Sequence, residues 1–313
     1  MNKEVRVFAP ATVANVAVGF DILGFALQAP GDEVVARQTD GQGVRISRIT
    51  GDEGKLPLEA EKNTAGYAAL RLLEQLGQSK IGVELEIHKK MPFGSGLGSS
   101  AASAAAGVMA VNALLGMPLP KLDTLHCAVL GEQIADGAYH ADNVAPALLG
   151  GMVLIRANEG LDVHNLPIPA ELHVAVAYPH VSILTKDARE VLSPTTTLPQ
   201  SIRQCGNLGG LIVGLYESDY ALIGRSLQDV IIEPQRAQLI TGFAEVKQAA
   251  LQAGALGCSI SGAGPSVFAL CKGATLAKAA GEAMQRSFQQ RAIPCDLYVS
   301  PINREGAKLI KQL

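Results

Sequence analysis

The sequence has few aromatic residues and few charged residues. It has no tryptophan, only six tyrosines and seven phenylalanines, and charged side chains make up 18% of its 313 residues. The formal net charge is −3, and no run of basic residues is longer than Lys89-Lys90. A nucleic-acid interface needs clustered basic side chains, and a groove for single strands needs stacking rings. We therefore expect no nucleic-acid partner.

Signals for secretion and for membrane insertion are also lacking. The first residues begin a strand-like alternation at Val5 without the apolar core of a signal peptide. The most apolar stretch, residues 101–117, is rich in alanine and too short to span a membrane, so it predicts a buried helix. The five cysteines are far apart and form no C-x-x-C pair. Reduced thiols in a cytoplasmic protein are therefore expected, with no membrane partner.

What the chain does have is length, glycine and alternating periodicity. With 313 residues and 48% hydrophobic content, two domains are predicted. A segment rich in Gly, Asn and Pro at residues 158–169 favours a division into 1–160 and 161–313. Short antiparallel strands open the chain, and helical and strand-like patterns are mixed in both halves, which is typical of an α+β fold. The main helices are expected at residues 101–115, 121–136, 208–227, 243–253 and 276–290.

The sharpest local signal is the segment Pro92-Phe93-Gly94-Ser95-Gly96-Leu97-Gly98-Ser99-Ser100, between a predicted strand and a predicted helix. Its glycines let the backbone approach an anion, and the N–H groups at the start of the helix point toward that anion. A Walker loop would need Lys after its last glycine, and a dinucleotide fingerprint would need G-x-G-x-x-G. Neither pattern is present. A phosphate-binding loop is favoured over a ligand-free tight turn.

The sequence resembles the GHMP kinases in this loop and in two further blocks. These blocks are Pro10-Ala11-Thr12-Val13-Ala14-Asn15-Val16-Ala17-Val18-Gly19-Phe20-Asp21 and Gly257-Cys258-Ser259-Ile260-Ser261-Gly262-Ala263-Gly264-Pro265-Ser266. The three blocks occur in the family's order across almost the whole chain. Within the family, the first block, residues 140–147 and Glu233-Pro234-x-Arg236 are most similar to the branch that acts on L-homoserine.

This resemblance implies a two-domain α+β fold. The amino-terminal domain would be ribosomal-S5-like with a left-handed βαβ crossover, and the carboxy-terminal domain would be ferredoxin-like. The implied reaction transfers the γ-phosphoryl group of ATP to the hydroxyl of L-homoserine, giving O-phospho-L-homoserine on the route to threonine. Two alternatives stay open: another small alcohol such as mevalonate as the acceptor, or a regulatory protein that binds nucleotide without catalysis. A homodimer is a further expectation.

The resemblance also implies where ATP and Mg²⁺ bind. Glu132 would hold Mg²⁺ together with a loop serine, Ser100 by preference and Ser99 as the alternative, because oxygen ligands suit this cation. The carboxy-terminal glycine loop, residues 262–265, would brace the first one. The ATP-binding residues would be Pro92, Phe93, Gly94, Ser95, Gly96, Leu97, Gly98, Ser99, Ser100, Ala101 and Ala102.

The acceptor site follows from the same resemblance. Arginines suit a carboxylate, and Asp21 suits an ammonium group. Asn143 would orient the reacting hydroxyl, with Asp142 as the candidate general base, although positioning and charge stabilisation can suffice for phosphoryl transfer. The chain departs from the family's usual first block at Val13 and at Val16-Ala17-Val18, which affects the contact made by Asn15. The residues expected to contact the acceptor are Asn15, Asp21, His140, Thr185, Arg189 and Arg236.

Overall fold

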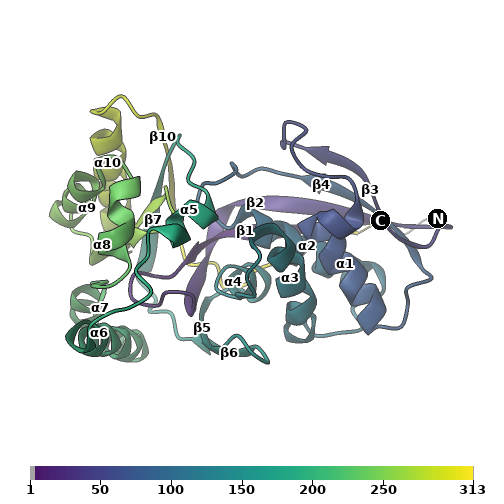
Figure 1. The fold of residues 1–313 in the computed structure, drawn as a ribbon, viewed down its shortest axis with the longest axis horizontal. Coiled ribbons are helices and arrows are strands. Elements are labelled where there is room, and N and C mark those ends of the chain that lie inside the picture. The colour runs from purple at the N-terminus through teal and green to yellow at the C-terminus, as the bar shows by residue number, and fades with distance from the viewer. Residues whose placement is uncertain (1–3, 313) are drawn as a thin grey trace.

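The structure is a computed structural model that describes residues 4–312. Figure 1 shows two lobes side by side, each built on its own β-sheet. The first sheet has seven strands and the second has four. The predicted two-domain α+β architecture is therefore confirmed.

The first sheet is centred on the long strand β2, which pairs with β1, β4 and β5. Its main path runs β11-β1-β2-β4-β3, and β6 is attached through β5. Partly buried and buried side chains alternate in the first half of β1, and all residues from Ala9 to Ala14 are buried. The strands of this sheet are β1 (Glu4–Ala14), β2 (Leu23–Thr39), β3 (Gly43–Thr50), β4 (Gly82–His88), β5 (Met152–Ala157), β6 (Asp162–Leu166) and β11 (Lys308–Gln312).

Helix α2 lies at the centre of the first lobe. Its residues from Ala101 to Leu114 are all buried, because small side chains on every face let neighbouring elements pack closely around it. A Cβ atom on Gly107 would lie 2.6 Å from the carbonyl oxygen of Ala65, so glycine permits the approach of α1. The predicted buried helix is thus confirmed. The elements around it are η1 (Ala60–Lys62), α1 (Thr64–Gln75), α2 (Ser99–Leu114), α3 (Lys121–Asp136) and α4 (Val144–Leu149).

The second sheet is antiparallel in the order β10-β7-β9-β8, the strand order of a ferredoxin-like domain. Strand β7 alternates between two cores: Val174 and Val176 join the larger one, and Ala175 and Ala177 pack with α9 and α10. The elements of this lobe are β7 (Leu172–Pro179), α5 (Thr185–Glu190), α6 (Leu198–Glu217), α7 (Tyr220–Ser226), α8 (Glu233–Arg236), η2 (Ala237–Leu239), α9 (Phe243–Gln252), β8 (Gly257–Ile260), β9 (Val267–Lys272), α10 (Ala274–Gln289) and β10 (Cys295–Pro301).

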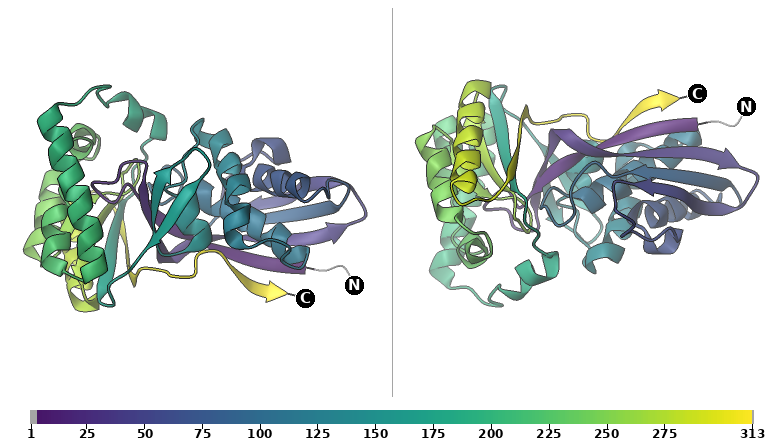
Figure 2. Two further views of the ribbon diagram at one scale, coloured as in Figure 1. Left: turned by 90° about the horizontal axis from the view of Figure 1, so that it is seen from below. Right: turned by 90° about the horizontal axis from the view of Figure 1, so that it is seen from above.

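The chain crosses between the lobes more than once. Strand β11 leaves the second lobe and pairs with β1, so the two ends of the described chain lie side by side (Figure 2). Strands β5 and β6 form a hairpin within the first sheet. A division after residue 160 would cut this hairpin. We propose that the amino-terminal domain extends to Leu166 and also includes β11.

Strands β1 and β2 are antiparallel, as expected for the opening strands, and β3 runs parallel to β4 because α1 carries the chain across between them. One sequence prediction differs from the structure. Helix α6 begins at Leu198 rather than at residue 208. Thr197 caps it by accepting a hydrogen bond from the backbone N–H of Gln200, and a proline occupies the first turn. Exposed apolar residues in its first turns hide the amphipathic pattern.

Candidate functional site

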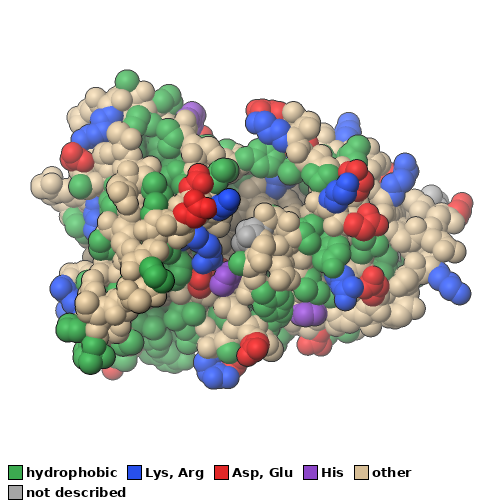
Figure 3. Space-filling model, in the orientation of Figure 1, with side chains coloured by type: hydrophobic (Ala, Val, Ile, Leu, Met, Phe, Trp, Pro, Cys, Tyr) green, Lys and Arg blue, Asp and Glu red, His purple; other side chains and the backbone are tan. Residues whose placement is uncertain are grey.

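A cavity of about 760 Å³ lies between the two lobes. Figure 3 shows the hollow at the centre of this face, with charged side chains gathered along one edge. Both lobes contribute to its walls: the first glycine loop, the 140–143 segment, residues 183–186 with Arg189, and the second glycine loop, residues 262–264. A site between domains can hold two substrates and bring them together.

The first glycine loop adopts a backbone that requires glycine. Gly94, Gly96 and Gly98 have φ values of 59°, 74° and 67°. Gly98 is the N-cap of α2, whose free N–H groups begin beside the cavity. A Cβ atom on Gly98 would lie 2.2 Å from the hydroxyl oxygen of Thr12. The loop therefore combines an anion-binding helix terminus with close packing against β1.

Not every residue expected to bind ATP reaches the cavity. The loop from Pro92 to Gly96, together with Gly98, Ser99 and Ser100, lines it. Leu97, Ala101 and Ala102 have side chains buried in the core, so they would contact a nucleotide through the backbone alone. Ser103, one turn further along α2, also lines the cavity.

The second glycine loop holds the first one in place. The Ser261 hydroxyl donates to the carbonyl oxygen of Gly96 at 2.7 Å. The backbone N–H of Ser266 donates to the carbonyl oxygen of Ser95 at 3.2 Å. Asn15 extends this contact: its side-chain nitrogen donates to the Gly262 carbonyl at 2.9 Å, and its oxygen accepts from the N–H of Asp21 at 3.0 Å. The Asn15 amide thus binds backbone at both ends.

A buried ion pair at the start of α2 was missed by the sequence analysis. The Lys89 ammonium pairs with Asp32 and also donates to the Ser99 carbonyl at 2.8 Å and the Ser103 hydroxyl at 2.7 Å. The Ser99 hydroxyl donates to Asp32 at 3.1 Å. The side chains of Lys89 and Asp32 are almost completely buried. Lys89 follows an ordinary strand, and only the fold brings Asp32 beside it.

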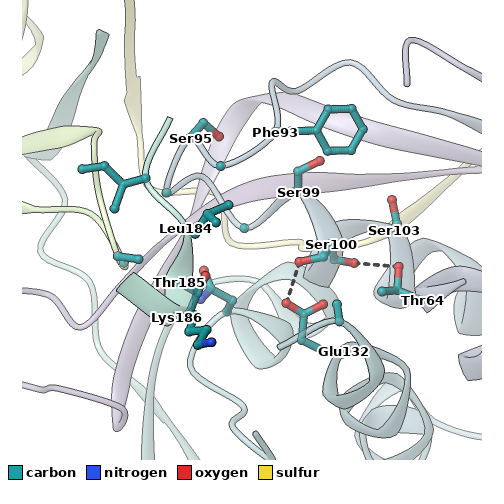
Figure 4. A pocket seen from close by; sticks show the side chains of 18 of the residues that line it. Thr64, Phe93, Ser95, Ser99, Ser100, Ser103, Glu132, Leu184, Thr185 and Lys186 are labelled. Atoms are coloured by element: carbon teal, nitrogen blue, oxygen red, sulfur yellow. Dashed lines mark hydrogen bonds between the residues drawn. The ribbon is translucent and has the colours of Figure 1, made fainter. Parts of the chain in front are cut away.

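Ser100 faces the other side of the cavity. Its hydroxyl donates to Glu132 Oε1 at 2.6 Å, and its carbonyl oxygen accepts from the Thr64 hydroxyl at 3.4 Å (Figure 4). Helix α3 supplies Glu132. The structure therefore brings together the carboxylate and the serine preferred for a metal site, whereas the Ser99 hydroxyl points to Asp32.

The expected acceptor residues form a compact cluster of charges. Arg189 donates two hydrogen bonds to the carboxylate of Asp21, at 3.1 and 3.0 Å. The guanidinium carbon atoms of Arg189 and Arg236 lie 5.5 and 4.9 Å from the centre of the Phe20 ring. The Phe20 ring thus lies within cation–π distance of two like charges. His140 Nδ1 lies 3.8 Å from Asp21.

Arg236 is buried and fixed by backbone carbonyls. Its Nε donates to Ala188 at 2.8 Å, and a terminal nitrogen donates to Gly262 at 3.1 Å. Burial, together with the neighbouring charge of Arg189, lowers the pKa of its guanidinium to about 10. Asp21 acts in the opposite direction. The site therefore holds a cation whose charge an incoming anion would stabilise.

The remaining expected residues come from two segments. Asp142 and Asn143 line the cavity at the start of α4, and Asp142 is buried. Asn143 Oδ1 accepts a hydrogen bond of 2.7 Å from the Thr12 hydroxyl. Thr185 is an exposed residue on α5, at the mouth of the cavity, where Lys186 also lies (Figure 4). The sequence analysis did not single out Thr12 or Lys186.

No helix in the described part of the chain is long and apolar enough to cross a membrane. Within residues 4–312, leaving aside side chains that the structure does not describe, no group of three or more His, Cys, Asp or Glu could hold a metal ion.

Comparisons with known proteins agree with this geometry. The family model for the GHMP kinases N terminal domain matches residues 63–151, and the model for the GHMP kinases C terminal region matches residues 211–290. Homoserine kinase of Chlorobium phaeovibrioides is 52% identical over 98% of this chain and all of its own length. The crystal structure of homoserine kinase from Cytophaga hutchinsonii superposes with a TM-score of 0.96, at 55% identity, covering 98% of this chain and 97% of that one.

A more distant structure shares the fold alone. L. major mevalonate kinase superposes with a TM-score of 0.71 at 15% identity, covering 96% of this chain and 95% of that one. The two-lobed fold and the glycine loop at the start of α2 thus define a kinase of the GHMP class. The identities of 52% and 55% to homoserine kinases over 98% of this chain are more specific than the class. The chain belongs to the homoserine kinase family.

The buried pair beside the glycine loop gives a test of stability. Replacing Lys89 with Met leaves the Asp32 carboxylate buried without its cation, so we expect the free energy of unfolding to fall by about 3–5 kcal/mol. Replacing Lys90 with Met is the matched control, because Lys90 is half exposed and its partner Glu33 also pairs with Arg6. That change should cost about 1 kcal/mol or less.

Urea denaturation of both variants would measure the difference. The double variant Asp32→Asn/Lys89→Met removes both charges and should recover much of the loss. Equal stability of the Lys89 and Lys90 variants would contradict the assignment of a buried pair that holds the loop.

Proposed function

We propose that the protein transfers the γ-phosphoryl group of ATP to the side-chain hydroxyl of L-homoserine, giving O-phospho-L-homoserine for threonine biosynthesis. The observation that carries this proposal is the cluster of Asp21, Arg189 and Arg236 in the same cavity as the glycine loop. Phosphate binds at the N-terminus of α2, and an amino acid with two opposite charges binds opposite it. The relatives of the family support the same substrate.

The pairing of Asp21 with Arg189 supports a zwitterionic acceptor. These two side chains neutralise each other in the structure. An amino acid can replace both halves of this pair, because its carboxylate takes Arg189 and Arg236 and its ammonium takes Asp21. A carboxylate without an ammonium group, such as mevalonate, would separate the pair and leave Asp21 without a cation. Breaking an ion pair without replacing both partners is costly.

Positioning and charge stabilisation supply most of the chemistry. The acceptor oxygen forms the new bond to phosphorus, and the bond to the bridging oxygen breaks with its electron pair remaining on ADP. The hydroxyl proton passes to an oxygen of the transferred phosphoryl group, with Asp142 as the alternative proton acceptor. Asn143 orients the acceptor hydroxyl, and Thr185 and His140 enclose the acceptor. Asn15 holds the loop that carries Asp21.

Mg²⁺ fits the residues at the edge of the cavity. Ser100 and Glu132 offer a hydroxyl and a carboxylate 2.6 Å apart beside the N-terminus of α2. Mg²⁺ usually takes one or two protein oxygens and completes its shell with phosphates and water. When bound, it would neutralise charge on the phosphates during transfer. The hydrogen bond between Ser100 and Glu132 holds both side-chain oxygens in place for Mg²⁺.

A panel of acceptors tests the proposed reaction. ADP release would be measured with L-homoserine, 4-hydroxybutanoate, 3-amino-1-propanol, mevalonate and galactose. We expect kcat/KM for L-homoserine to exceed the others by roughly a hundredfold or more, because 4-hydroxybutanoate, mevalonate and 3-amino-1-propanol each leave a charged group of the site unpaired and galactose offers the site no charge. Equal use of 4-hydroxybutanoate would refute the role of Asp21, and equal use of 3-amino-1-propanol would refute that of the arginines. Nucleotide binding without turnover would point to a regulatory protein.

The metal site has its own test. Replacing Glu132 with Gln keeps the side chain's size but removes its charge, so half-maximal activity should require at least roughly tenfold more Mg²⁺. Glu282→Gln on α10 is the matched control. The Glu282 side chain lies at the surface, and its ion pairs within the described chain are with exposed cations. Titration of ADP release with Mg²⁺ measures both variants. An unchanged requirement in the Glu132 variant would remove this residue from the metal site.

We also propose that the protein is a cytoplasmic homodimer. Helix α6 supports the dimer, because Leu198, Ile202, Val213 and Tyr216 are between 46% and 72% exposed. Gly206 and Gly209 have open space at the Cβ position, so a second helix could approach closely. Light scattering should give twice the mass of the 32.6 kDa chain, and Ile202→Glu should reduce it. A wild-type mass of one chain would refute the dimer.

A further inference from the structure

We infer that Thr12 is a positioning residue for phosphoryl transfer and acts through Asn143. The inference rests on the proposed function, in which Asn143 orients the acceptor hydroxyl. Thr12 lies on β1 within the first lobe, 131 residues before Asn143, and its side chain does not reach the solvent. The residues on either side of it in the sequence, Ala11 and Val13, are apolar and buried. A hydroxyl in such surroundings is costly unless it forms a hydrogen bond.

The hydrogen bond of Thr12 fixes the orientation of the Asn143 amide. The Thr12 hydroxyl donates to Asn143 Oδ1 at 2.7 Å. An asparagine amide has one acceptor end and one end with two N–H donors. With its oxygen held by Thr12, the amide is expected to present its NH₂ group to the cavity, whose lining includes Asn143.

This orientation limits what Asn143 can do. An NH₂ group donates to a lone pair on the acceptor oxygen, and it cannot take the proton of the hydroxyl. The proton therefore passes from the hydroxyl to an oxygen of the transferred phosphoryl group, or to Asp142 as the alternative. The other lone pair of the hydroxyl oxygen attacks phosphorus. A rotated amide would instead present its oxygen and accept the hydroxyl's proton in a hydrogen bond. That arrangement would fix the position of the hydroxyl's proton instead of one of its lone pairs.

Thr12 also joins the acceptor side of the cavity to the phosphate side. Its backbone N–H donates to the carbonyl oxygen of Leu97, within the glycine loop, at 3.0 Å. A Cβ atom on Gly98 would lie 2.2 Å from Thr12 Oγ1 and 2.7 Å from Asn143 Oδ1. The loop, the threonine and the asparagine are thus in direct contact. Thr12 sets the position of Asn143 relative to the start of α2, where the phosphates bind.

Replacing Thr12 with Val tests the inference, because valine keeps the branched shape and removes the hydroxyl. We expect kcat with L-homoserine to fall roughly ten- to a hundredfold, as for the loss of one oriented donor, with KM for both substrates changing less than about threefold. Thr12→Ser keeps the hydroxyl and should retain most of kcat. Thermal unfolding of each variant would show whether the fold is preserved.

A double-mutant cycle separates action through Asn143 from a structural effect. In an Asn143→Ala background, Thr12→Val should cause no further loss of kcat. A further loss by the same factor as in the wild type would overturn the inference. If Thr12→Val does not fold, Asn143→Asp replaces it: aspartate can still accept from Thr12 but lacks the NH₂ group, so kcat should fall to the level of Asn143→Ala. A kcat near that of the wild type would overturn the inference.

The outcomes also distinguish the inference from the proposed function. Absence of turnover by the wild-type protein with L-homoserine would reject the proposed function itself. A normal kcat in Thr12→Val, together with a reduced kcat in Asn143→Ala, would reject Thr12 alone.

Discussion

The close packing of the first glycine loop is the constraint on which the site depends. Gly98 contacts Thr12 and Asn143, and Gly96 contacts the second glycine loop, at distances that leave no room for a side chain. The loop therefore fixes β1, the 140–143 segment and the carboxy-terminal lobe relative to the start of α2. Because the free N–H groups of α2 lie at this point, the same contacts that close the fold also place the proposed phosphate site.

Charges in the cavity are balanced by partners from distant parts of the chain. Asp32 neutralises Lys89 beneath the loop, and Asp21 neutralises Arg189 on the acceptor side. Arg236 is held by backbone carbonyls instead, so its charge is the least compensated of the three cations. The site is thus stable without substrate and still offers a positive charge to an acidic group.

Local patterns predicted most of the elements. The alanine-rich segment forms the expected buried helix α2. The sequence did not show which strands pair. Strand β3 runs parallel to β4 because of the crossover through α1, and β5 and β6 form a hairpin on either side of the expected boundary after residue 160. The start of α6 is exposed, so the cap at Thr197 indicates where the helix begins and the hydrophobic pattern does not.

The sequence by itself determined the family and the position of the glycine loop, since short motifs of this kind specify their own backbone geometry. Only the tertiary structure decided which side chains meet. It turned the Ser99 hydroxyl to Asp32 and the Ser100 hydroxyl to Glu132, and it joined Thr12 to Asn143. Hydrogen bonds depend on distance and direction in space, and residues more than a hundred positions apart acquire these only when the chain folds.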